Sequence, residues 1–179
     1  MDQQEKTIKS KQIYNGRIIK VRVDEVTVAN GNKADREIVE HPGGVVIIAT
    51  TDDDKILLVE QYRKPVEENL LELPAGKLEA NEDPLECAKR ELIEETGYKA
   101  AFVEHLFSFY TTPGYSNEIL HLYKADTLEE VGVDPDENEI IINHMISRND
   151  ILKMINSGEI KDSKTVMGLL FYLVGDNDA

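Results

Sequence analysis

The feature that most constrains this chain is a helix with clear start and stop signals at residues 83–96. Asp83 can cap its N-terminus, Pro84 suits the first helical position, and Glu86 is placed to complete a capping box. Gly97 supplies the C-terminal stop. The sequence therefore predicts a helix with fixed ends, whose buried stripe at helical spacing is Leu85, Ala88 and Leu92.

Patterns typical of β-strands lie on both sides of this helix. Strands are expected at 17–23, 24–28, 36–40, 45–49, 56–63, 103–110, 119–125 and 140–146, and further helices at 148–157 and 163–174. Residues 1–10 are polar and are expected to be loose. Strands before and after a helix, joined partly by hairpins, predict an α/β (α+β) fold or a mixed α/β/α sandwich.

A break at His41–Gly44 divides the chain into a small first part and a large second part. Residues 1–43 contain a hairpin signal at Asn30–Asn32 and are expected to form a small antiparallel sheet. So small a sheet is unstable alone and must pack on something, such as a partner subunit. Residues 44–179 are expected to form the main domain.

Charge and cysteine content exclude several classes of protein. A net charge of −15 makes non-specific binding to nucleic acid or an anionic membrane unfavourable. An anionic substrate would then need a bridging cation, either a divalent metal or local arginines. Cys87 is the single cysteine, so an intramolecular disulfide and a thiolate zinc cage are excluded, which fits a cytoplasmic protein. The longest apolar run, 167–174, is too short to span a bilayer.

Three carboxylates share one face of the helix at 83–96. Glu91, Glu94 and Glu95 stand at positions i, i+3 and i+4, and Arg90 is the only close cation. Taken alone, the helix favours a solvated charged face. The other interpretation is a site for a hard cation, because Mg²⁺ prefers oxygen ligands.

The segment before the helix favours the metal interpretation. Gly76, in Leu73–Lys77, lets the backbone approach a ligand closely, so a carbonyl there can join the carboxylates. Gly76, five residues, Glu82, seven residues and then Arg90–Gly97 resemble the Nudix box. Tyr98 at the last apolar position of the box is a mild departure.

This resemblance implies a Nudix-type α/β/α sandwich that uses Mg²⁺ or Mn²⁺ to hydrolyse a nucleoside diphosphate linked to another group. It implies that the Ala75 carbonyl, Glu91 and Glu95 are metal ligands. Glu94 would be a ligand, a supporting group or the base that activates water, and Arg90 would orient the glutamates. Glu91 and Glu95 are both expected to be exposed to the metal.

The loop that follows resembles the ADP-ribose pyrophosphatase subgroup. Pro113 lies sixteen residues after Gly97, within a loop at 110–118 that is similar to the substrate loop of that subgroup. The resemblance implies a homodimer that exchanges its N-terminal sheet, and these substrate-binding residues: Arg36, Glu37 and Glu40 toward the adenosine half, Arg63 toward the diphosphate, and Thr112, Gly114 and Glu118 in the loop.

A late acidic segment completes the expected site. By position, Glu137 is the general base and Glu139 a metal ligand, although these roles could be reversed, and an ordinary acidic turn is the alternative. The expected reaction is hydrolysis of ADP-ribose to AMP and ribose 5-phosphate. Two alternatives stay open: another nucleoside diphosphate sugar such as GDP-mannose, or a sensor that binds ADP-ribose without turnover. His105, His121 and Cys87 are expected to be structural.

Overall fold

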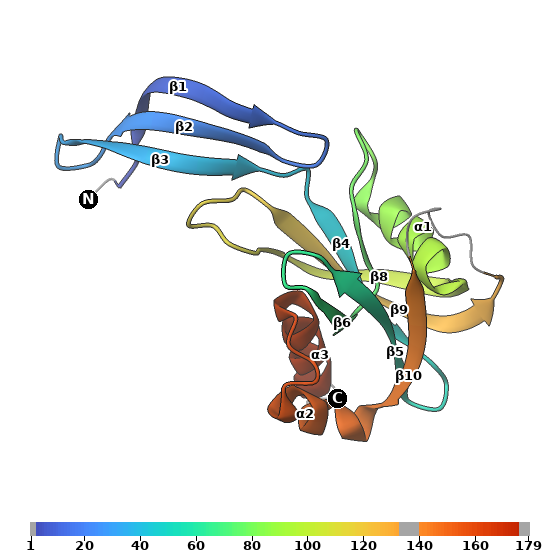
Figure 1. Ribbon diagram of the computed structural model, residues 1–179. Coiled ribbons are helices and arrows are strands. Elements are labelled where there is room, and N and C mark those ends of the chain that lie inside the picture. The colour runs from blue at the N-terminus through green and yellow to red at the C-terminus, as the bar shows by residue number, and fades with distance from the viewer. Residues whose placement is uncertain (1–2, 133–139, 176–179) are drawn as a thin grey trace. The chain divides into compact units, whose positions relative to one another are not determined.

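The computed structural model describes residues 3–132 and 140–175 (Figure 1). The chain forms two compact units. The first contains Met1–Gly43 together with Phe109–Ile119, and the second contains Gly44–Ser108 together with Leu120–Ala179. The first unit is therefore discontinuous in sequence, because it includes a segment from the middle of the chain.

The first unit contains a three-stranded antiparallel sheet in the order β1-β2-β3 (Figure 1). Its strands are β1 (Lys6–Asn15), β2 (Lys20–Thr27) and β3 (Lys33–Glu40). The expectation that residues 1–10 are loose is wrong for residues 6–10, because β1 pairs with β2 from Lys6 onward. Every side chain of β1 is exposed, so no alternation of buried and exposed residues marks the strand in the sequence. The expected strands at 17–23 and 24–28 are one strand, β2.

The second unit is built on a mixed sheet of seven strands in the order β10-β5-β4-β9-β8, with β6 paired to β5 and β7 to β4. Strands β4 and β9 run parallel, whereas β5, β6, β7 and β10 pair antiparallel with their neighbours. The strands are β4 (Gly44–Thr50), β5 (Lys55–Arg63), β6 (Glu68–Glu72), β7 (Ala75–Lys77), β8 (Tyr98–Tyr110), β9 (Ile119–Glu130) and β10 (Ile141–Ser147). Neither β6 nor β7 was expected, since both are short.

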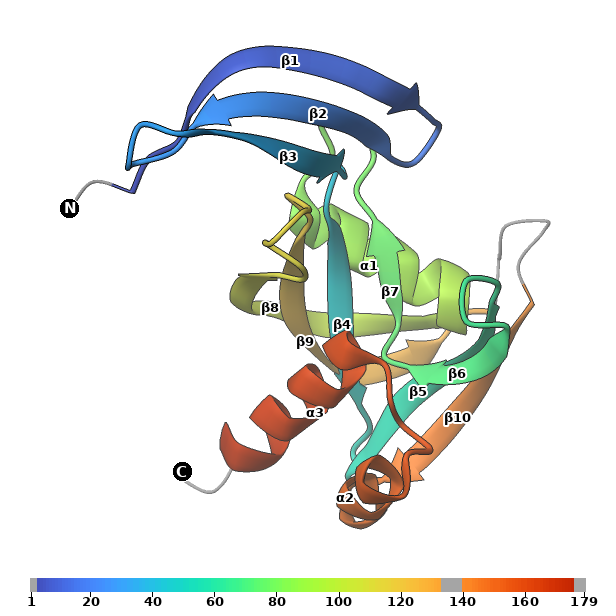
Figure 2. The ribbon, with the colours of Figure 1, turned by 60° about the vertical axis from the view of Figure 1, so that its left-hand side comes forward.

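Helices cover both faces of this sheet (Figure 2). They are α1 (Pro84–Thr96), α2 (Arg148–Ser157) and α3 (Ser163–Gly175). Strand β4 shows the layering, because its alternate side chains serve opposite faces. Ile47 belongs to the core cluster that includes α1, whereas Ile48 reaches toward Gly168 of α3. The expected α/β/α sandwich with a mixed sheet is confirmed.

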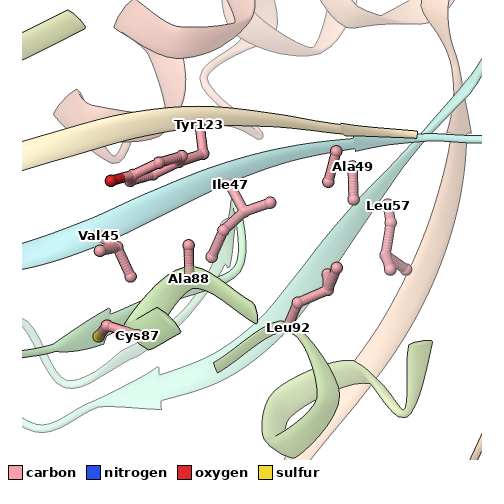
Figure 3. Packing of buried hydrophobic residues seen from close by; sticks show 9 residues of the cluster. Val45, Ile47, Ala49, Leu57, Cys87, Ala88, Leu92 and Tyr123 are labelled. Atoms are coloured by element: carbon pink, nitrogen blue, oxygen red, sulfur yellow. The ribbon is translucent and has the colours of Figure 1, made fainter. Parts of the chain in front are cut away.

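The core between α1 and the sheet fixes the position of the helix (Figure 3). All nine residues of this cluster are at most 4% exposed. Cys87 is one of them and packs in this core. Burial is the main cause that raises the pKa of its thiol to about 12, and the neighbouring Glu82 is the second cause, so the thiol stays protonated. The cluster contains Val45, Ile47, Ala49, Leu57, Cys87, Ala88, Leu92, Tyr123 and Ala125.

In the part of the chain that the structure describes, no helix combines the length and the apolar character needed to cross a membrane.

Candidate metal and diphosphate site

Helix α1 carries four charged residues that the sequence assigns to the site, and the ends of the helix are fixed as the sequence predicts. The Asp83 side chain accepts hydrogen bonds from the backbone N–H groups of Leu85 and Glu86. Gly97 adopts a left-handed conformation, with φ of 76°, and its N–H bonds to the carbonyl of Ile93. The Glu86 carboxylate pairs with Lys89, so the cap rests on Asp83 and the expected capping box is not formed.

The Glu91 carboxylate lies directly over the backbone of Gly76. A Cβ atom added to Gly76 would stand 1.8 Å from Cδ of Glu91, far inside van der Waals contact. The absence of a side chain at Gly76 leaves room for Glu91, so a carboxylate can rest against the turn that precedes α1. The close approach expected from the sequence is present, and its partner is Glu91.

The backbone of Ala75 is held by Glu95, which lies in the last turn of α1. Its N–H donates to Oε2 of Glu95 over 2.9 Å, so Ala75, Glu91 and Glu95 come together around one short strand, β7. Glu95 is only 7% exposed and the Glu91 side chain only 13%, so both carboxylates are largely shielded from solvent, and their expected exposure to a metal stays a prediction. The position of Glu95 on the inner side of α1, where it bonds the backbone of β7, explains its burial.

Arg90 connects the remaining carboxylates. Its Nε and NH2 atoms donate to the two carboxylate oxygens of Glu82 over 2.8 and 3.0 Å, and its NH1 donates to Glu91 over 2.8 Å and Glu94 over 2.7 Å. The hydrogen bonds from Arg90 lower the pKa of Glu82 to about 2. One guanidinium thus contacts three carboxylates, which leaves the cluster with excess negative charge.

These residues fit a divalent cation. The candidate donors are all oxygens, as hard divalent ions require, and the Glu91 carboxylate lies against the bare backbone of Gly76, the neighbour of Ala75. Within residues 3–132 and 140–175, no three acidic, histidine or cysteine side chains are already gathered as a ligand set. Two of the candidate ligands are instead held within the protein, Glu91 by Arg90 and Glu95 by the Ala75 N–H.

Arg63, the expected diphosphate contact, lies at the end of β5 and is bound to Glu72. The two form a bidentate pair, with Nε to Oε1 at 2.7 Å and NH2 to Oε2 at 2.8 Å. Hydrogen bonding to Glu72 raises the pKa of Arg63, and the charge of Glu95 adds to the effect. The guanidinium of Arg63 is therefore committed to Glu72 through two of its nitrogens.

Glu72 is a residue that the sequence reasoning missed. It is 1% exposed, and it also accepts a hydrogen bond from Nζ of Lys164 in α3. The usable signal is a single glutamate inside the apolar run Leu70–Leu73, since a carboxylate there must be paired if the run is buried. Its partners in β5 and α3 could not be identified without the fold.

The other substrate candidates belong to the first unit. Arg36 pairs with Glu5, and Glu40 pairs with Arg22. Glu37 lies next to Arg36 in β3, so strand alternation points the two side chains to opposite faces, and Glu37 is exposed. The expected group Arg36, Glu37 and Glu40 therefore does not share one face of the sheet.

The loop at 110–118 is joined to the end of β3. The Val39 N–H donates to the Tyr115 carbonyl over 2.8 Å, and the His41 N–H donates to the side chain of Asn117 over 2.8 Å. Glu118 accepts from Oγ1 of Thr111 over 2.6 Å and lies 3.2 Å from Nδ1 of His41. Thr112 and Gly114, also expected at this site, are exposed in the same loop, and a Cβ added to Gly114 would meet open space.

Glu137 and Glu139 lie outside the described residues, so their expected roles as base and ligand stay predictions. His105 and His121 are linked through Oγ of Ser108, at 3.0 and 2.7 Å. Burial and then the neighbouring His105 lower the pKa of His121, which fits a sheet histidine that stays neutral.

The α/β/α sandwich and the acidic cluster of α1 are the features to compare with known proteins. Residues 40–165 match the NUDIX domain family, and residues 5–39 match a family described as the nucleoside diphosphate sugar hydrolase N-terminal domain. The chain therefore belongs to the Nudix hydrolase family, whose members generally need a divalent metal.

Individual relatives cover nearly the whole chain. It is 48% identical over 170 residues to the methanol dehydrogenase activator of Bacillus methanolicus, covering 94% of this chain and 92% of that protein. It is 42% identical, with the same coverage, to an ADP-ribose pyrophosphatase of Bacillus subtilis. A solved structure of an ADP compounds hydrolase matches with a TM-score of 0.87 at 20% identity, over 99% of this chain and 98% of that one, and supports the fold.

Proposed function

We propose that this chain hydrolyses the diphosphate bond of ADP-ribose to AMP and ribose 5-phosphate with Mg²⁺ as the metal, or Mn²⁺ in its place. The observation that carries the proposal is the gathering of Ala75, Glu91 and Glu95 around the bare backbone of Gly76. The relative of Bacillus subtilis, an ADP-ribose pyrophosphatase at 42% identity, supports the choice of substrate.

The residues have distinct roles in this proposal. The Ala75 carbonyl, Glu91 and Glu95 would hold Mg²⁺, with Glu139 as a further ligand. When bound, the metal neutralises the charge of the diphosphate and makes the attacking water more acidic. Glu137 or Glu94 would take the proton from that water, which attacks phosphorus as the bond to the bridging oxygen breaks.

The remaining residues would bind the substrate and keep the acidic cluster in place. Arg90 keeps Glu82, Glu91 and Glu94 in position. Arg63 would contact the diphosphate. The residues assigned to the rest of the substrate are Arg36, Glu37, Glu40, Thr112, Gly114 and Glu118.

The experiment is a panel of initial rates with Mg²⁺, using ADP-ribose, GDP-mannose and other nucleoside diphosphate sugars. Hydrolysis of ADP-ribose with the highest kcat/KM, yielding AMP, supports the proposal. A higher kcat/KM for GDP-mannose would assign the same site to another sugar. Tight binding of ADP-ribose without AMP release would instead identify a sensor.

The assembly belongs to the same proposal. We infer a cytoplasmic homodimer in which the N-terminal sheet of residues 1–43 is exchanged between subunits, while 44–179 form the hydrolase domain. Support comes from the sheet itself, whose β1 side chains are all exposed and which is too small to be stable alone. Light scattering should give twice the 20.2 kDa chain mass, and a monomer would contradict the exchange.

A second candidate function rests on one finding. The relative of Bacillus methanolicus, at 48% identity, is named for activating methanol dehydrogenase. Activation of such a dehydrogenase is tested by adding this protein with Mg²⁺ to it and measuring methanol oxidation. A rate increase that Glu91→Gln abolishes would connect the activation to the same site, and an unchanged rate would dismiss it.

A further inference from the structure

A buried polar cluster lies behind the turn that carries Ala75 and Gly76. At its centre is Glu72, held by the bidentate pair with Arg63 and by Nζ of Lys164. Burial raises the pKa of Glu72, but the hydrogen bonds and charges of Arg63 and Lys164 outweigh it, and the net pKa lies below the ordinary value. Glu72 is therefore a carboxylate fixed in its charged form between two cations.

The N-terminus of α3 forms the other half of this cluster. Oδ2 of Asp162 accepts hydrogen bonds from Nζ of Lys164 over 2.9 Å, and from the N–H and the hydroxyl of Thr165 over 3.0 and 2.7 Å. The Thr165 hydroxyl in turn accepts from the N–H of Leu73 over 2.9 Å. Thr165 is fully buried, so water does not compete for these bonds.

Close packing strengthens the connection between α3 and the turn. A Cβ added to Gly168 would lie 2.8 Å from Cδ1 of Leu73, so the helix backbone passes unusually near this side chain. One turn of α3 therefore contacts Leu73 twice: the Thr165 hydroxyl accepts a hydrogen bond from its N–H, and the bare backbone of Gly168 packs against its side chain.

The segment fixed by α3 leads directly to the metal candidates. After Glu72 and Leu73, the carbonyl of Pro74 accepts from Ile47 over 2.8 Å, and the N–H of Ala75 donates to Glu95 over 2.9 Å. The turn is thus anchored upstream by α3 and downstream by α1. A shift at Leu73 would displace the Ala75 carbonyl relative to Glu91 and Glu95.

We propose that Glu72, Lys164 and Thr165 are positioning residues, through which α3 sets the place of the Ala75 carbonyl and the orientation of Arg63. None of them has to touch metal or substrate. Glu72 occupies Nε and NH2 of Arg63, so the orientation of the guanidinium depends on Glu72 and only NH1 is left to contact a diphosphate. The inference deepens the proposed function and rests on it, because it assigns these residues to the same site.

The first experiment compares Thr165→Val with Thr165→Ser. Valine matches threonine in shape but removes the hydroxyl, whereas serine keeps it. Mn²⁺ affinity, measured by calorimetry without substrate, should fall about tenfold in Thr165→Val and stay near wild type in Thr165→Ser. Equal Mn²⁺ affinity in Thr165→Val and wild type, with both folded by circular dichroism, would overturn the proposal.

The second experiment tests the orientation of Arg63 with Lys164→Met. Loss of the ammonium leaves Glu72 and Arg63 free to reorient, so KM for ADP-ribose should rise about tenfold with a smaller change in kcat. Lys161→Met is the matched control, because Lys161 pairs with Glu68 at the surface nearby, and its KM should equal that of wild type. An unchanged KM in Lys164→Met would contradict the assignment.

The two readouts separate this inference from the proposed function. If wild-type protein hydrolyses no ADP-ribose, the proposed substrate fails, but Mn²⁺ affinity still tests the role of Thr165. If ADP-ribose is hydrolysed and Thr165→Val binds Mn²⁺ like wild type, the positioning role fails alone.

Discussion

Two arginines hold carboxylates in the second unit, and their clusters differ in charge balance. Arg90 faces three glutamates, at positions 82, 91 and 94, and the cluster keeps an excess of negative charge. Arg63 and Lys164 face Glu72 and Asp162, so that cluster is neutral overall. The unbalanced cluster has the excess negative charge that the proposed metal would neutralise, whereas the balanced cluster has its charges already paired.

The largest expected effect is on activity, and it comes from the unbalanced cluster. Glu91→Gln should lower kcat/KM for ADP-ribose about 100-fold or more, because it removes a metal donor. The free energy of unfolding without metal should change by less than about 1 kcal/mol, since Arg90 keeps two other carboxylates. Initial rates and urea unfolding in EDTA measure the two quantities.

Metal-dependent stabilisation provides the control for that variant. Mg²⁺ at a hundred times its Kd should raise the unfolding free energy of wild type by about 2.7 kcal/mol, and it should raise that of Glu91→Gln much less. A variant with wild-type turnover and the full stabilisation by Mg²⁺ would remove Glu91 from the metal site.

The next effect is on stability, and it comes from the balanced cluster. Glu72→Gln removes the buried carboxylate that pairs with Lys164 and with the partly exposed Arg63, and it should cost about 3 kcal/mol of unfolding free energy. Glu94→Gln is the matched change in the other cluster, and because Glu94 is 41% exposed it should cost less than about 1 kcal/mol. Similar urea midpoints for these two variants would contradict the proposed difference between the two clusters.

The smallest effect depends on pH. Hydrogen bonding to Arg90 lowers the pKa of Glu82 from 4.5 to about 2. The stability that this ion pair adds to the folded protein is therefore complete above pH 4.5, and it is lost as Glu82 becomes protonated toward pH 2. At pH 6, Glu82→Gln should be less stable than wild type by about 1–3 kcal/mol, and the difference should vanish near pH 2. Urea unfolding across this range measures it, and a pH-independent difference would show that Glu82 acts by packing.

The unbalanced cluster could be predicted from the sequence because its parts are local. Asp83 and Gly97 mark the ends of one helix, and helical spacing places Glu91, Glu94 and Glu95 on neighbouring turns. The resemblance then supplied Gly76 and Glu82 a few residues upstream. What spacing could not supply is the burial of Glu95, which depends on the packing of β7 against the helix.

The balanced cluster could not be predicted, because its contacts are far apart in the chain. Lys164 and Thr165 stand 92 residues from Glu72 and Leu73, respectively, and no local pattern connects them. Strand β1 was missed for the opposite reason: it pairs locally with β2, but all its side chains face solvent, so its hydrophobic pattern carries no signal.

The discontinuity of the first unit limits how the protein can be shortened. A chain that begins at Gly44 would lose β3, and with it the backbone groups of Val39 and His41 that bond the loop at 110–118. In that loop, the carbonyl of Tyr115 and the side-chain oxygen of Asn117 would then lose their hydrogen-bond donors. Deletion at the sequence boundary would therefore leave a segment of the first unit, Phe109–Ile119, without the strand it bonds, and grafting the first unit elsewhere would require two separate pieces of chain.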